Sequence, residues 1–372
     1  MSIEKIKVEH FLSLSKDHPV FDVRSPAEFS HAYIPEAYSL PLFDDEQRKV
    51  VGTAYKQQGR RQAIKIGLDY FGVRMTKMIE QVEEIVSKYS KFPISNSAAD
   101  HSFVLVHCWR GGMRSAALAW LLDLYGYKVY TLAGGYKAFR NWVLQQFAQP
   151  YNFKVLGGYT GSGKTILIRE WKRLGHPVID LENLANHKGS AFGAEGEKPQ
   201  PSQEMFENLL AINLFQQEIK SRTDKPQKES DVDYSLPAIW IEDESERIGN
   251  LNIPKSIWNQ MHNSTLYFID IPFEERLDYL VSTYGIIEKE NLINATVRIK
   301  KRLGGLETKN AVSFILQNKI REAFSILLRY YDKYYYKGLL NRKNLADILN
   351  KIPCNSVSIG NVRTLSFLQT TS

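Results

Sequence analysis

One cysteine in this sequence stands at the head of a short loop that is rich in glycine and arginine. Cys108 opens the sequence CWRGGMR, and Arg114 closes it. Glycines let successive backbone N–H groups point inward around an anion, and a helix after such a loop adds its positive N-terminal end. These residue types predict a thiolate nucleophile that faces a bound anion. The predicted anion-binding loop comprises Trp109, Arg110, Gly111, Gly112, Met113 and Arg114.

The pKa of the Cys108 thiol is expected to lie below the usual value for cysteine. The charges of Arg110 and Arg114 and the N-terminal end of the following helix would all stabilise the thiolate. The alternative is a structural cysteine, because a cysteine at the end of a buried strand is most often inert. The glycines and arginines at this spacing favour the nucleophile.

A second anion-binding loop follows later in the chain. The sequence GYTGSGKT satisfies the pattern Gly-x4-Gly-Lys-Thr between a predicted strand and a predicted helix, which is the context of a P-loop. In such a loop backbone N–H groups surround a diphosphate, Lys164 reaches the terminal phosphate, and Thr165 ligates Mg²⁺ when a nucleotide is bound. The predicted diphosphate-binding residues are Gly158, Tyr159, Thr160, Gly161, Ser162, Gly163, Lys164 and Thr165.

An acidic residue at the end of a neighbouring strand would complete a P-loop site by holding the metal. Glu242 and Asp243 follow the apolar run AIWI, and Asp243 is the preferred candidate. Asp180, which ends the run HPVID, is a rival for binding metal or substrate. Acids at strand ends are also common surface residues, so this assignment stays open.

Short apolar strands alternate with helical stretches around the cysteine loop. The strands are rich in Val and Phe, and the helices carry apolar residues at helical spacing, with Gly126 as a stop signal. This alternation predicts a parallel sheet with helices on both faces. The predicted strands are 20–24 and 102–108, the predicted helices are 78–89 and 115–127, and a polar loop spans 91–100.

The second half of the chain has the same architecture without repeating the sequence. Strand-like runs occupy 153–156, 176–180, 236–244 and 264–272, a hydrophilic loop is expected at 221–235, and helices follow from Phe273. We therefore predict an α/β chain with a parallel-sheet domain, a P-loop NTPase-like α/β domain and a helical basic C-terminal region. The predicted boundaries are 1–145 for the first domain, 146–152 for a linker, 153–285 for the P-loop core, 286–350 for the basic region and 351–372 for a tail.

The composition is that of an ordinary globular chain. Of the 372 residues, 43% are hydrophobic and 24% are charged, which suits about two domains. No apolar run reaches the roughly 18 residues of a membrane helix, and the charged N-terminus is unlike a signal peptide. The two cysteines, Cys108 and Cys354, cannot form a disulfide framework or a four-thiolate zinc site. We expect a cytoplasmic protein without a membrane partner, in which Cys354 is structural or incidental.

Positive charge is concentrated in the C-terminal third. The net charge is +7, whereas residues 291–350 alone hold twelve Lys or Arg against four Asp or Glu. Such an excess marks a surface for a polyanion such as RNA, although a solvated helical surface is the alternative. Arg298 and Arg302, one helical turn apart, would form a lid over phosphates, bind RNA or be solvated. The other candidate cations are Lys301, Arg329, Lys333 and Lys337, and also Lys56, Arg60, Arg61 and Lys65, which have the spacing of one helix face.

Five tyrosines lie among the C-terminal cations, and they permit two interpretations. Tyrosine rings can stack on the unpaired bases of an RNA loop. The alternative is an ordinary amphipathic helix with Tyr330 and Tyr334 in the core. The tyrosines are Tyr330, Tyr331, Tyr334, Tyr335 and Tyr336.

The first 145 or so residues resemble a rhodanese domain. DVRSPAEF, from Asp22, resembles the early Asp-x-Arg motif of that family, and LAGGYKAF, from Leu132, resembles its closing Gly-Gly turn. In that family the loop cysteine takes up sulfur or selenium. The loop here is longer than in common sulfur-transferring rhodaneses, and IPEA at 34–37 lacks the glycine that often precedes the alanine. The length Cys-x5-Arg instead resembles Cdc25-like cysteine phosphatases, so phosphatase chemistry stays open.

Taken together, the motifs resemble the tRNA 2-selenouridine synthase family over nearly the whole chain. The stretches that carry the resemblance are VGTAYKQQGRRQAIKIGL from Val51, CWRGGMRS, GGYTGSGKT and DLENLANHKGSAFG from Asp180. The resemblance implies a tRNA substrate with 2-thiouridine at wobble position 34. It further implies S-geranylation from geranyl diphosphate at the P-loop, followed by replacement of the geranylthio group with selenium from selenophosphate at Cys108. Selenophosphate synthetase would be the donor partner, and Mg²⁺ an optional ion.

Two other functions fit the same residues. The first is a P-loop kinase or NTPase fused to a Cdc25-like cysteine phosphatase, which would not need RNA. The second is an RNA-binding regulator with an inactive rhodanese module, against which the intact Cys108 and Lys164 argue. Whether the cysteine carries selenium covalently or only binds selenophosphate, and whether ATP or GTP is hydrolysed, are open from the sequence, as is the oligomeric state.

Overall fold

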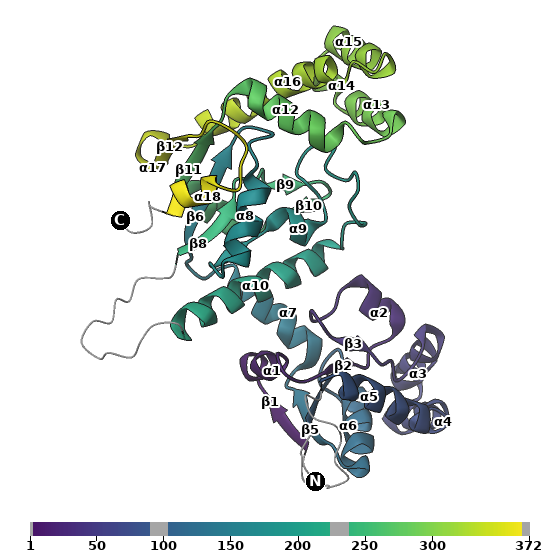
Figure 1. The fold of residues 1–372 in the computed structure, drawn as a ribbon. Helices are drawn as coiled ribbons and strands as arrows, with labels where there is room; N and C mark the ends of the chain where they lie inside the picture. Colours follow the sequence, from purple (N-terminus) through teal and green to yellow (C-terminus); the bar gives the residue numbers. More distant parts are fainter. Residues whose placement is uncertain (1–2, 90–102, 224–237, 367–372) are drawn as a thin grey trace, which may run out of the picture. The chain divides into compact units, whose positions relative to one another are not determined.

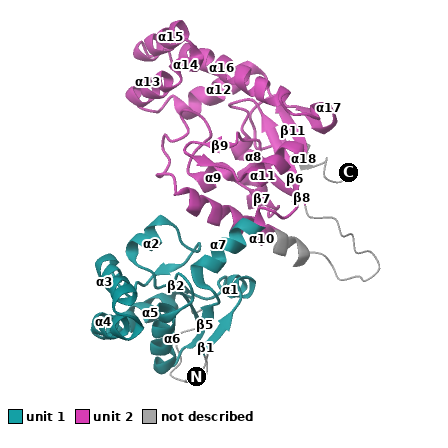
Figure 2. Cartoon of the chain, turned by 180° about the vertical axis from the view of Figure 1, so that it is seen from behind, with its two compact units in different colours: residues 1–145 teal, residues 146–372 magenta. Residues whose placement is uncertain are grey.

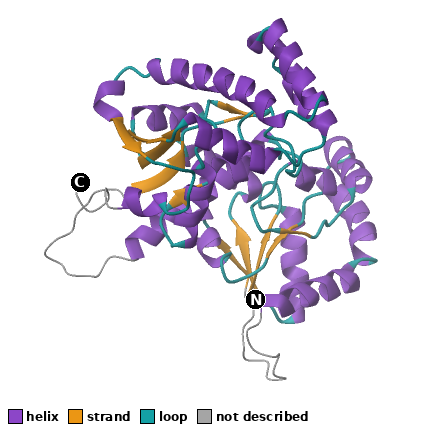
Figure 3. Cartoon of the chain, turned by 45° about the horizontal axis from the view of Figure 1, so that its top comes forward, coloured by secondary structure: helices purple, strands orange, loops and turns teal. Residues whose placement is uncertain are grey.

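The computed structural model describes residues 3–89, 103–223 and 238–366. The chain divides into two compact units, residues 1–145 and 146–372 (Figure 2). In each unit the strands gather into a sheet with helices beside it (Figure 3). Among the described residues, no helix combines the length and the apolar character that crossing a membrane requires.

The first unit is built on a five-stranded sheet in the order β1-β5-β4-β2-β3, and every pairing is parallel (Figure 1). Its strands are β1 Ile3–Ile6, β2 Val20–Asp22, β3 Tyr38–Ser39, β4 Phe103–His107 and β5 Lys128–Leu132. Its helices are α1 Val8–Leu14, α2 Pro26–His31, α3 Asp45–Gln57, α4 Arg60–Gly72, α5 Met75–Tyr89, α6 Met113–Tyr125 and α7 Gly135–Gln146.

The central strand β4 explains why the first unit folds as it does. Four of its five residues are buried, as expected for a strand covered by helices on both faces. Helix α6 returns from its carboxyl end and stops at Gly126, whose φ of 112° gives the left-handed cap that favours glycine. The apolar core contains Phe21, Val104 and Leu118. Strand β4 therefore presents its carboxyl end, and Cys108 after it, next to the end of β2.

The second unit has a five-stranded parallel sheet in the order β12-β11-β6-β8-β7 and a small antiparallel hairpin of β9 and β10. Its strands are β6 Asn152–Gly158, β7 Val178–Ile179, β8 Ala238–Glu242, β9 Arg247–Ile248, β10 Leu251–Asn252, β11 Thr265–Asp270 and β12 Leu349–Pro353. Its helices are α8 Lys164–Arg173, α9 Leu181–Ala185, α10 Gln203–Thr223, α11 Lys255–Asn263, α12 Phe273–Tyr284, α13 Lys289–Arg298, α14 Lys300–Leu303, α15 Gly305–Leu316, α16 Ile320–Leu340, α17 Leu345–Ile348 and α18 Asn361–Ser366.

Helices α12 to α16 form a helical region with its own apolar cluster. Leu277, Leu292, Ile315 and Phe324 are buried in it, one from each of the four longer helices. The long helix α16 contributes apolar residues at helical spacing toward this cluster and turns charged residues outward. This packing holds α16 beside α12 (Figure 1).

The predicted α/β fold class is confirmed, and so are the predicted strands in both halves. The predicted tail from residue 351 is wrong for its first three residues. Lys351–Pro353 belong to β12, which pairs in parallel with β11 at the edge of the second sheet. Only Ile352 of this strand is buried, so no apolar run announces it in the sequence. The loop predicted at 91–100 and residues 224–235 of the other loop lie outside the described residues, while 221–223 end helix α10.

Candidate functional site

Cys108 lies at the carboxyl end of the central strand, where two glycines bring two segments of backbone together. A Cβ on Gly135 would lie 2.2 Å from the Cys108 carbonyl oxygen, and one on Gly111 would lie 2.6 Å from the Leu132 carbonyl oxygen. Both glycines have positive φ, 61° in each case. The Tyr136 N–H donates to the Cys108 carbonyl at 2.8 Å. The LAGG turn thus braces the cysteine loop, and both glycines are required for this close approach.

The sulfur of Cys108 is buried and hydrogen-bonded. It lies 3.2 Å from the Ser115 hydroxyl and accepts the Gly112 N–H at 3.3 Å. Burial raises the pKa of the thiol, but the hydrogen bonds from Ser115 and from the backbone N–H groups of Gly112, Ser115 and Arg110 outweigh it and lower that pKa. The predicted lowering is confirmed, with a different cause: hydrogen bonds stabilise the thiolate in place of the arginine charges.

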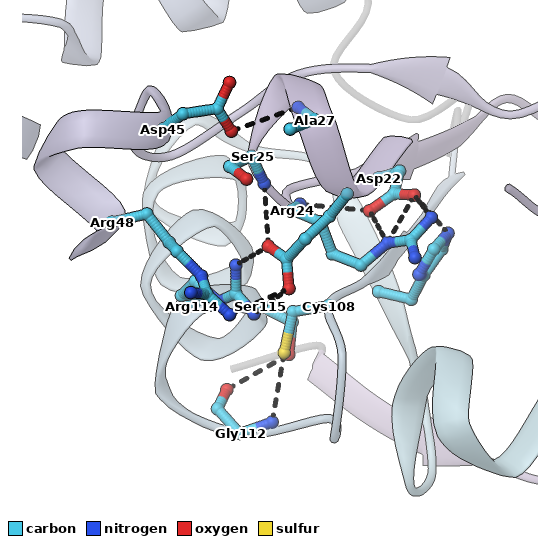
Figure 4. A network of polar contacts seen from close by, with 12 residues as sticks. Asp22, Arg24, Ser25, Ala27, Asp45, Arg48, Cys108, Gly112, Arg114 and Ser115 are labelled. Carbon is cyan, nitrogen blue, oxygen red and sulfur yellow. Dashed lines mark hydrogen bonds and ion pairs between the residues drawn. The ribbon is translucent and has the colours of Figure 1, made fainter. Parts of the chain in front are cut away.

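Arg114 does not face the sulfur as a free cation. Its guanidinium donates to the Glu28 carboxylate at 2.6 and 3.4 Å, within the network of Figure 4. Glu28 also accepts the Ser25 N–H at 3.0 Å, and Arg48 lies 3.6 Å from it. Burial opposes ionisation of Glu28, yet the bonds to Arg114 hold its pKa low, at about 2. Arg110 is exposed.

The helix that follows the cysteine loop begins earlier than predicted. Helix α6 starts at Met113, so Met113 and Arg114 belong to its first turn. Trp109 and Met113 are partly exposed beside the cysteine, at 37% and 44%. Gly112 is the residue before the helix, and its N–H points at the sulfur. The helix N-terminus therefore faces the thiol, as predicted.

A buried ion pair fixes the neighbouring strand end. Arg24 donates to the Asp22 carboxylate, with the shortest N–O distance at 2.6 Å, and its guanidinium lies 3.8 Å from the centre of the Tyr136 ring. His107 is fully buried 3.7 Å from Asp22. Burial lowers the pKa of His107 despite the opposing charge of Asp22. The early Asp-x-Arg motif is thus a structural support for the end of β4.

The P-loop follows β6 and leads into α8. Gly161 and Gly163 have φ values of 79° and 78°, which favour glycine. The Lys164 ammonium donates to the Gly158 carbonyl at 3.0 Å, and the buried Ser162 hydroxyl makes no hydrogen bond to the described residues. All of Thr160 to Thr165 line one cavity. The predicted diphosphate-binding residues thus start at the carboxyl end of β6, the middle strand of this sheet, and six of them, Thr160 to Thr165, line the cavity.

Residues that were not predicted to contact the P-loop hold it in place. Arg276 of α12 donates to the Thr160 carbonyl at 3.0 Å and pairs with Asp332 of α16 at 2.8 Å. Tyr335, also in α16, accepts the Gly158 N–H at 3.2 Å and donates to Asp243 at 2.6 Å. These contacts join residues far apart in the sequence, so no local pattern announces them.

The acids near the P-loop have other partners than expected. Asp243, the preferred metal-binding candidate, is bonded to Tyr335 and Arg342. Asp180 caps α9 by accepting the Asn183 N–H at 2.9 Å. Glu242 is fully buried and accepts the Glu182 N–H at 3.3 Å. Burial raises the pKa of Glu242 and of Asp180.

The acid that contacts the predicted metal ligand is Glu182. Its carboxylate accepts the Thr165 hydroxyl at 2.7 Å. Hydroxyl and carboxylate oxygens suit Mg²⁺, so these two residues would hold the ion. No group of three or more His, Cys, Asp or Glu within the described ranges is arranged to bind a metal by itself. Glu182 lies in the stretch from Asp180 to Gly193, in which only Asp180 was predicted as a candidate for binding metal or substrate.

The P-loop opens into a cavity of about 980 Å³ within the second unit. Its lining includes polar side chains, among them Lys164, Thr165 and Glu182. It also includes a set of apolar and aromatic side chains, here called the apolar wall, which comprises Phe192, Leu280, Tyr284, Phe324, Leu327, Leu328 and Tyr331. The apolar wall begins at the P-loop itself, because a Cβ on Gly161 would lie 3.0 Å from the Leu280 side chain.

The predicted pair of lid arginines is not on one helix face. Helix α13 ends at Arg298 and α14 begins at Lys300, so a helix break at Ile299 lies between the two arginines. Arg298 donates to Glu195 at 3.4 Å, and neither Arg298 nor Arg302 lines the cavity. Neither arginine thus lies at the cavity in this structure, and the lid role stays a prediction. Lys301 and Arg302 are exposed, as a nucleic-acid contact would require.

The buried and exposed side chains of helix α16 differ in part from those predicted from the sequence. Arg329, Lys333 and Lys337 are exposed. The inward tyrosines are Tyr331, whose hydroxyl accepts the Ala191 N–H at 3.2 Å, and Tyr335. A core position for Tyr334 is wrong, since it is 42% exposed. Tyr331 and Tyr335 are held inside, so they do not stack on RNA bases in this conformation.

The basic patch in the first unit spans two helices. Helix α3 ends at Gln57 and α4 begins at Arg60, after Gly59 with φ 86°. The predicted single helix face is therefore wrong. Lys56, Arg60, Arg61 and Lys65 are all exposed on this helical pair.

Family models match both units. The model described as a rhodanese-like domain matches residues 8–141, and the model of the tRNA 2-selenouridine synthase AAA domain matches residues 151–296. The chain is similar to three curated proteins named tRNA 2-selenouridine synthase. The protein of Sulfurovum sp. is 33% identical over 345 residues, which are 86% of each chain. That of Nitrosomonas europaea is 34% identical over 83% of this chain and 73% of its own. That of Shewanella denitrificans is 32% identical over 90% of this chain and 92% of its own.

Proposed function

This chain belongs to the tRNA 2-selenouridine synthase family, and from that premise we propose that it replaces sulfur by selenium in 2-thiouridine at wobble position 34 of tRNA. The proposed reaction has two steps at two sites. The P-loop unit transfers a geranyl group from geranyl diphosphate to the thiocarbonyl sulfur. The rhodanese unit then supplies selenium from selenophosphate at Cys108. The chain is thus proposed to be a transferase of selenium-containing groups with geranyltransferase activity.

One observation carries the first step: the P-loop opens directly onto an apolar wall. A P-loop binds a diphosphate through backbone N–H groups and its lysine. In a kinase or NTPase the group beyond the terminal phosphate is water or a polar acceptor, which an apolar wall does not suit. An allylic diphosphate has a charged head and a hydrocarbon tail, and the cavity offers both surfaces.

In this step the sulfur attacks the first carbon of the geranyl chain. The carbon–oxygen bond to the diphosphate breaks, the electron pair leaves with the diphosphate, and the N3 proton of the base is lost. Lys164 stabilises the charge that develops on the leaving group. Thr165 and Glu182 would hold Mg²⁺, which adds further positive charge there when bound.

In the second step the selenium of selenophosphate attacks C2 of the base, and geranylthiolate leaves with the electron pair of the C–S bond. Water then cleaves the P–Se bond, which releases phosphate and leaves 2-selenouridine. Alkylation makes the displacement possible, because a thiolate leaves far more readily than the sulfur of a thiocarbonyl. Cys108, with its lowered thiol pKa and the Gly112 N–H at its sulfur, supports a binding site for selenophosphate. A covalent carrier with an S–Se bond would also need a two-electron oxidant, because selenium in selenophosphate is at the selenide level. Selenophosphate synthetase is the proposed donor partner.

The tRNA is proposed to contact exposed cations in both units. In the second unit these are Lys301, Arg302, Arg329, Lys333 and Lys337, and in the first they are Lys56, Arg60 and Arg61. Such contacts supply affinity through the phosphates and make it depend on salt.

The experiment that tests the proposal supplies a 2-thiouridine tRNA with geranyl diphosphate alone and analyses its nucleosides by mass spectrometry. S-geranyl-2-thiouridine is the expected product. A parallel reaction contains ATP or GTP and a phosphopeptide. Release of phosphate there, without any change in the tRNA, would favour the kinase or NTPase with a Cdc25-like phosphatase.

A further inference from the structure

The apolar wall of the P-loop cavity includes residues of two helices that contact the P-loop, α12 and α16. Helix α12 touches the loop through Arg276 and Leu280, and α16 touches it through Tyr335. The two helices pack side by side (Figure 1). The number of residues between Tyr335 and another residue of α16 therefore gives the distance along the helix from the contact with Gly158.

Of the α16 residues that line the cavity, Phe324 is the farthest along the helix from the P-loop. It precedes Tyr335 by eleven residues, which corresponds to about 16 Å at the rise of an α-helix. Tyr331, Leu328 and Leu327 line the cavity at intermediate positions. A hydrocarbon chain that starts at the P-loop and follows α16 passes these residues and ends at Phe324.

Phe324 both lines the cavity and belongs to the apolar core of the helical region. It is only 5% exposed and belongs to the buried cluster that contains Leu292, Ala295 and Ile315. Its ring therefore has the cavity on one side and packed helices on the other. Because that core is close-packed, a chain longer than the available space has no path past the ring.

We propose that Phe324 sets the length of the isoprenoid chain that the P-loop cavity accepts. This inference rests on the proposed function, since it concerns the hydrocarbon tail of the diphosphate substrate. The head binds the P-loop, the first isoprene unit contacts Leu280 and Tyr331, and the end of the chain abuts Phe324. Truncation of this ring opens apolar space, which takes up a hydrocarbon in preference to water.

The test compares geranyl diphosphate with farnesyl diphosphate, which is one isoprene unit longer. For the full chain and for Phe324→Ala, we would measure the affinity of each diphosphate and the rate of its transfer to a 2-thiouridine tRNA. The expected result is a shift of the farnesyl-to-geranyl ratio by at least about tenfold toward farnesyl, the scale on which apolar pockets discriminate chain length. The affinity for inorganic pyrophosphate, which has no tail, should not change.

The matched control is Phe314→Ala. Phe314 packs against the same apolar cluster from α15 but does not line the cavity. It should leave the ratio unchanged, which separates a change of pocket length from a general loosening of the helical region. If Phe324→Ala does not fold, Phe324→Leu supplies a smaller truncation with a shift in the same direction.

An unchanged ratio in a folded variant that still binds pyrophosphate would overturn the inference. So would an equal shift in Phe314→Ala. Failure of the proposed function is distinguishable, because the unaltered chain would then transfer no isoprenoid at all. The two affinities would still decide the role of Phe324 in that case.

Discussion

Cys108 accepts the Gly112 N–H and faces the Ser115 hydroxyl, while Arg114 is bonded to Glu28. The single proton of that hydroxyl has two acceptors, the sulfur and the Gly112 carbonyl at 3.0 Å. Ionisation of the thiol makes the sulfur the stronger acceptor, so the hydroxyl turns toward it. The loop therefore stabilises a thiolate by short-range hydrogen bonds, and its arginine remains in an ion pair.

This arrangement gives Ser115→Ala a definite effect on the reactivity of the cysteine. Loss of the hydroxyl removes a hydrogen bond that lowers the thiol pKa. The thiolate is the form present above that pKa, so raising the pKa decreases the thiolate fraction at neutral pH. Alkylation by iodoacetamide, followed as a function of pH, should shift to higher pH. Ser13→Ala, whose hydroxyl donates to the His10 carbonyl in α1, is the control. An unshifted profile would mean that Ser115 does not stabilise the thiolate.

Lys164 is expected to be essential for geranyl transfer. Lys164→Ala removes the cation that stabilises the leaving diphosphate, and loss of one such group costs about 10²- to 10³-fold in rate. The measurement is formation of S-geranyl-2-thiouridine by the variant. Lys172→Ala, an exposed lysine at the other end of the same helix, should behave like the unaltered chain. Normal transfer by Lys164→Ala would rule out the diphosphate role of the P-loop.

At the scale of elements, helix α16 has two functions on two faces. Its inner face holds the P-loop through Tyr335 and, by way of Asp332, through Arg276. Its outer face carries Arg329, Lys333 and Lys337. One helix thus supports the diphosphate site and presents the cations proposed to contact tRNA.

Tyr335→Phe tests the inner face. The change removes the hydroxyl that accepts the Gly158 N–H, and an unpaired buried N–H costs about 1–3 kcal/mol. The Asp243 carboxylate loses one hydrogen bond and keeps its ion pair with Arg342. Since the affected N–H belongs to the P-loop, the affinity for inorganic pyrophosphate should fall by about tenfold or more, as measured by calorimetry. Tyr336→Phe is the matched control, because Tyr336 is 51% exposed. Equal affinities in the two variants would contradict a role for Tyr335 in positioning the loop.

The local motifs were readable from the sequence because their residues are neighbours in the chain. Both glycine-rich loops and the strands that lead to them follow from short patterns of this kind. The helix breaks at Gly59 and Ile299 were missed, because the spacing of charges does not reveal where a helix ends. The roles of Glu182, Tyr335 and Arg276 at the P-loop were missed for another reason: each acts through a partner that is distant in sequence, and only the packed fold brings the two together.

At the scale of the whole molecule, each proposed step has a unit with its own sheet and core. Cys108→Ser should therefore abolish incorporation of selenium while leaving S-geranylation intact. Nucleoside mass spectrometry after reaction with geranyl diphosphate and selenophosphate measures both products at once. The Cys354→Ser variant is the control, since that cysteine is buried beside β12 in the other unit. Loss of both products in Cys108→Ser would refute the assignment of the two steps to separate units.

Binding of tRNA should depend on the exposed cations of α16. Replacing Lys333 and Lys337 by Ala removes two phosphate contacts, so the slope of log affinity against log salt should become shallower by about 0.7–0.9 for each contact. Binding of pyrophosphate should be unaffected, because both lysines are exposed and neither lines the P-loop cavity. An unchanged salt slope, measured by filter binding at several ionic strengths, would place the tRNA elsewhere.

The central claim is that the geranylated base is an intermediate between 2-thiouridine and 2-selenouridine. It is tested most directly by isolating tRNA that carries S-geranyl-2-thiouridine and giving it to the protein with selenophosphate but without geranyl diphosphate. The expected result, seen by mass spectrometry, is conversion of the geranylated nucleoside to 2-selenouridine with release of geranylthiol. Persistence of the geranylated nucleoside, while 2-thiouridine tRNA is selenated directly under the same conditions, would contradict it.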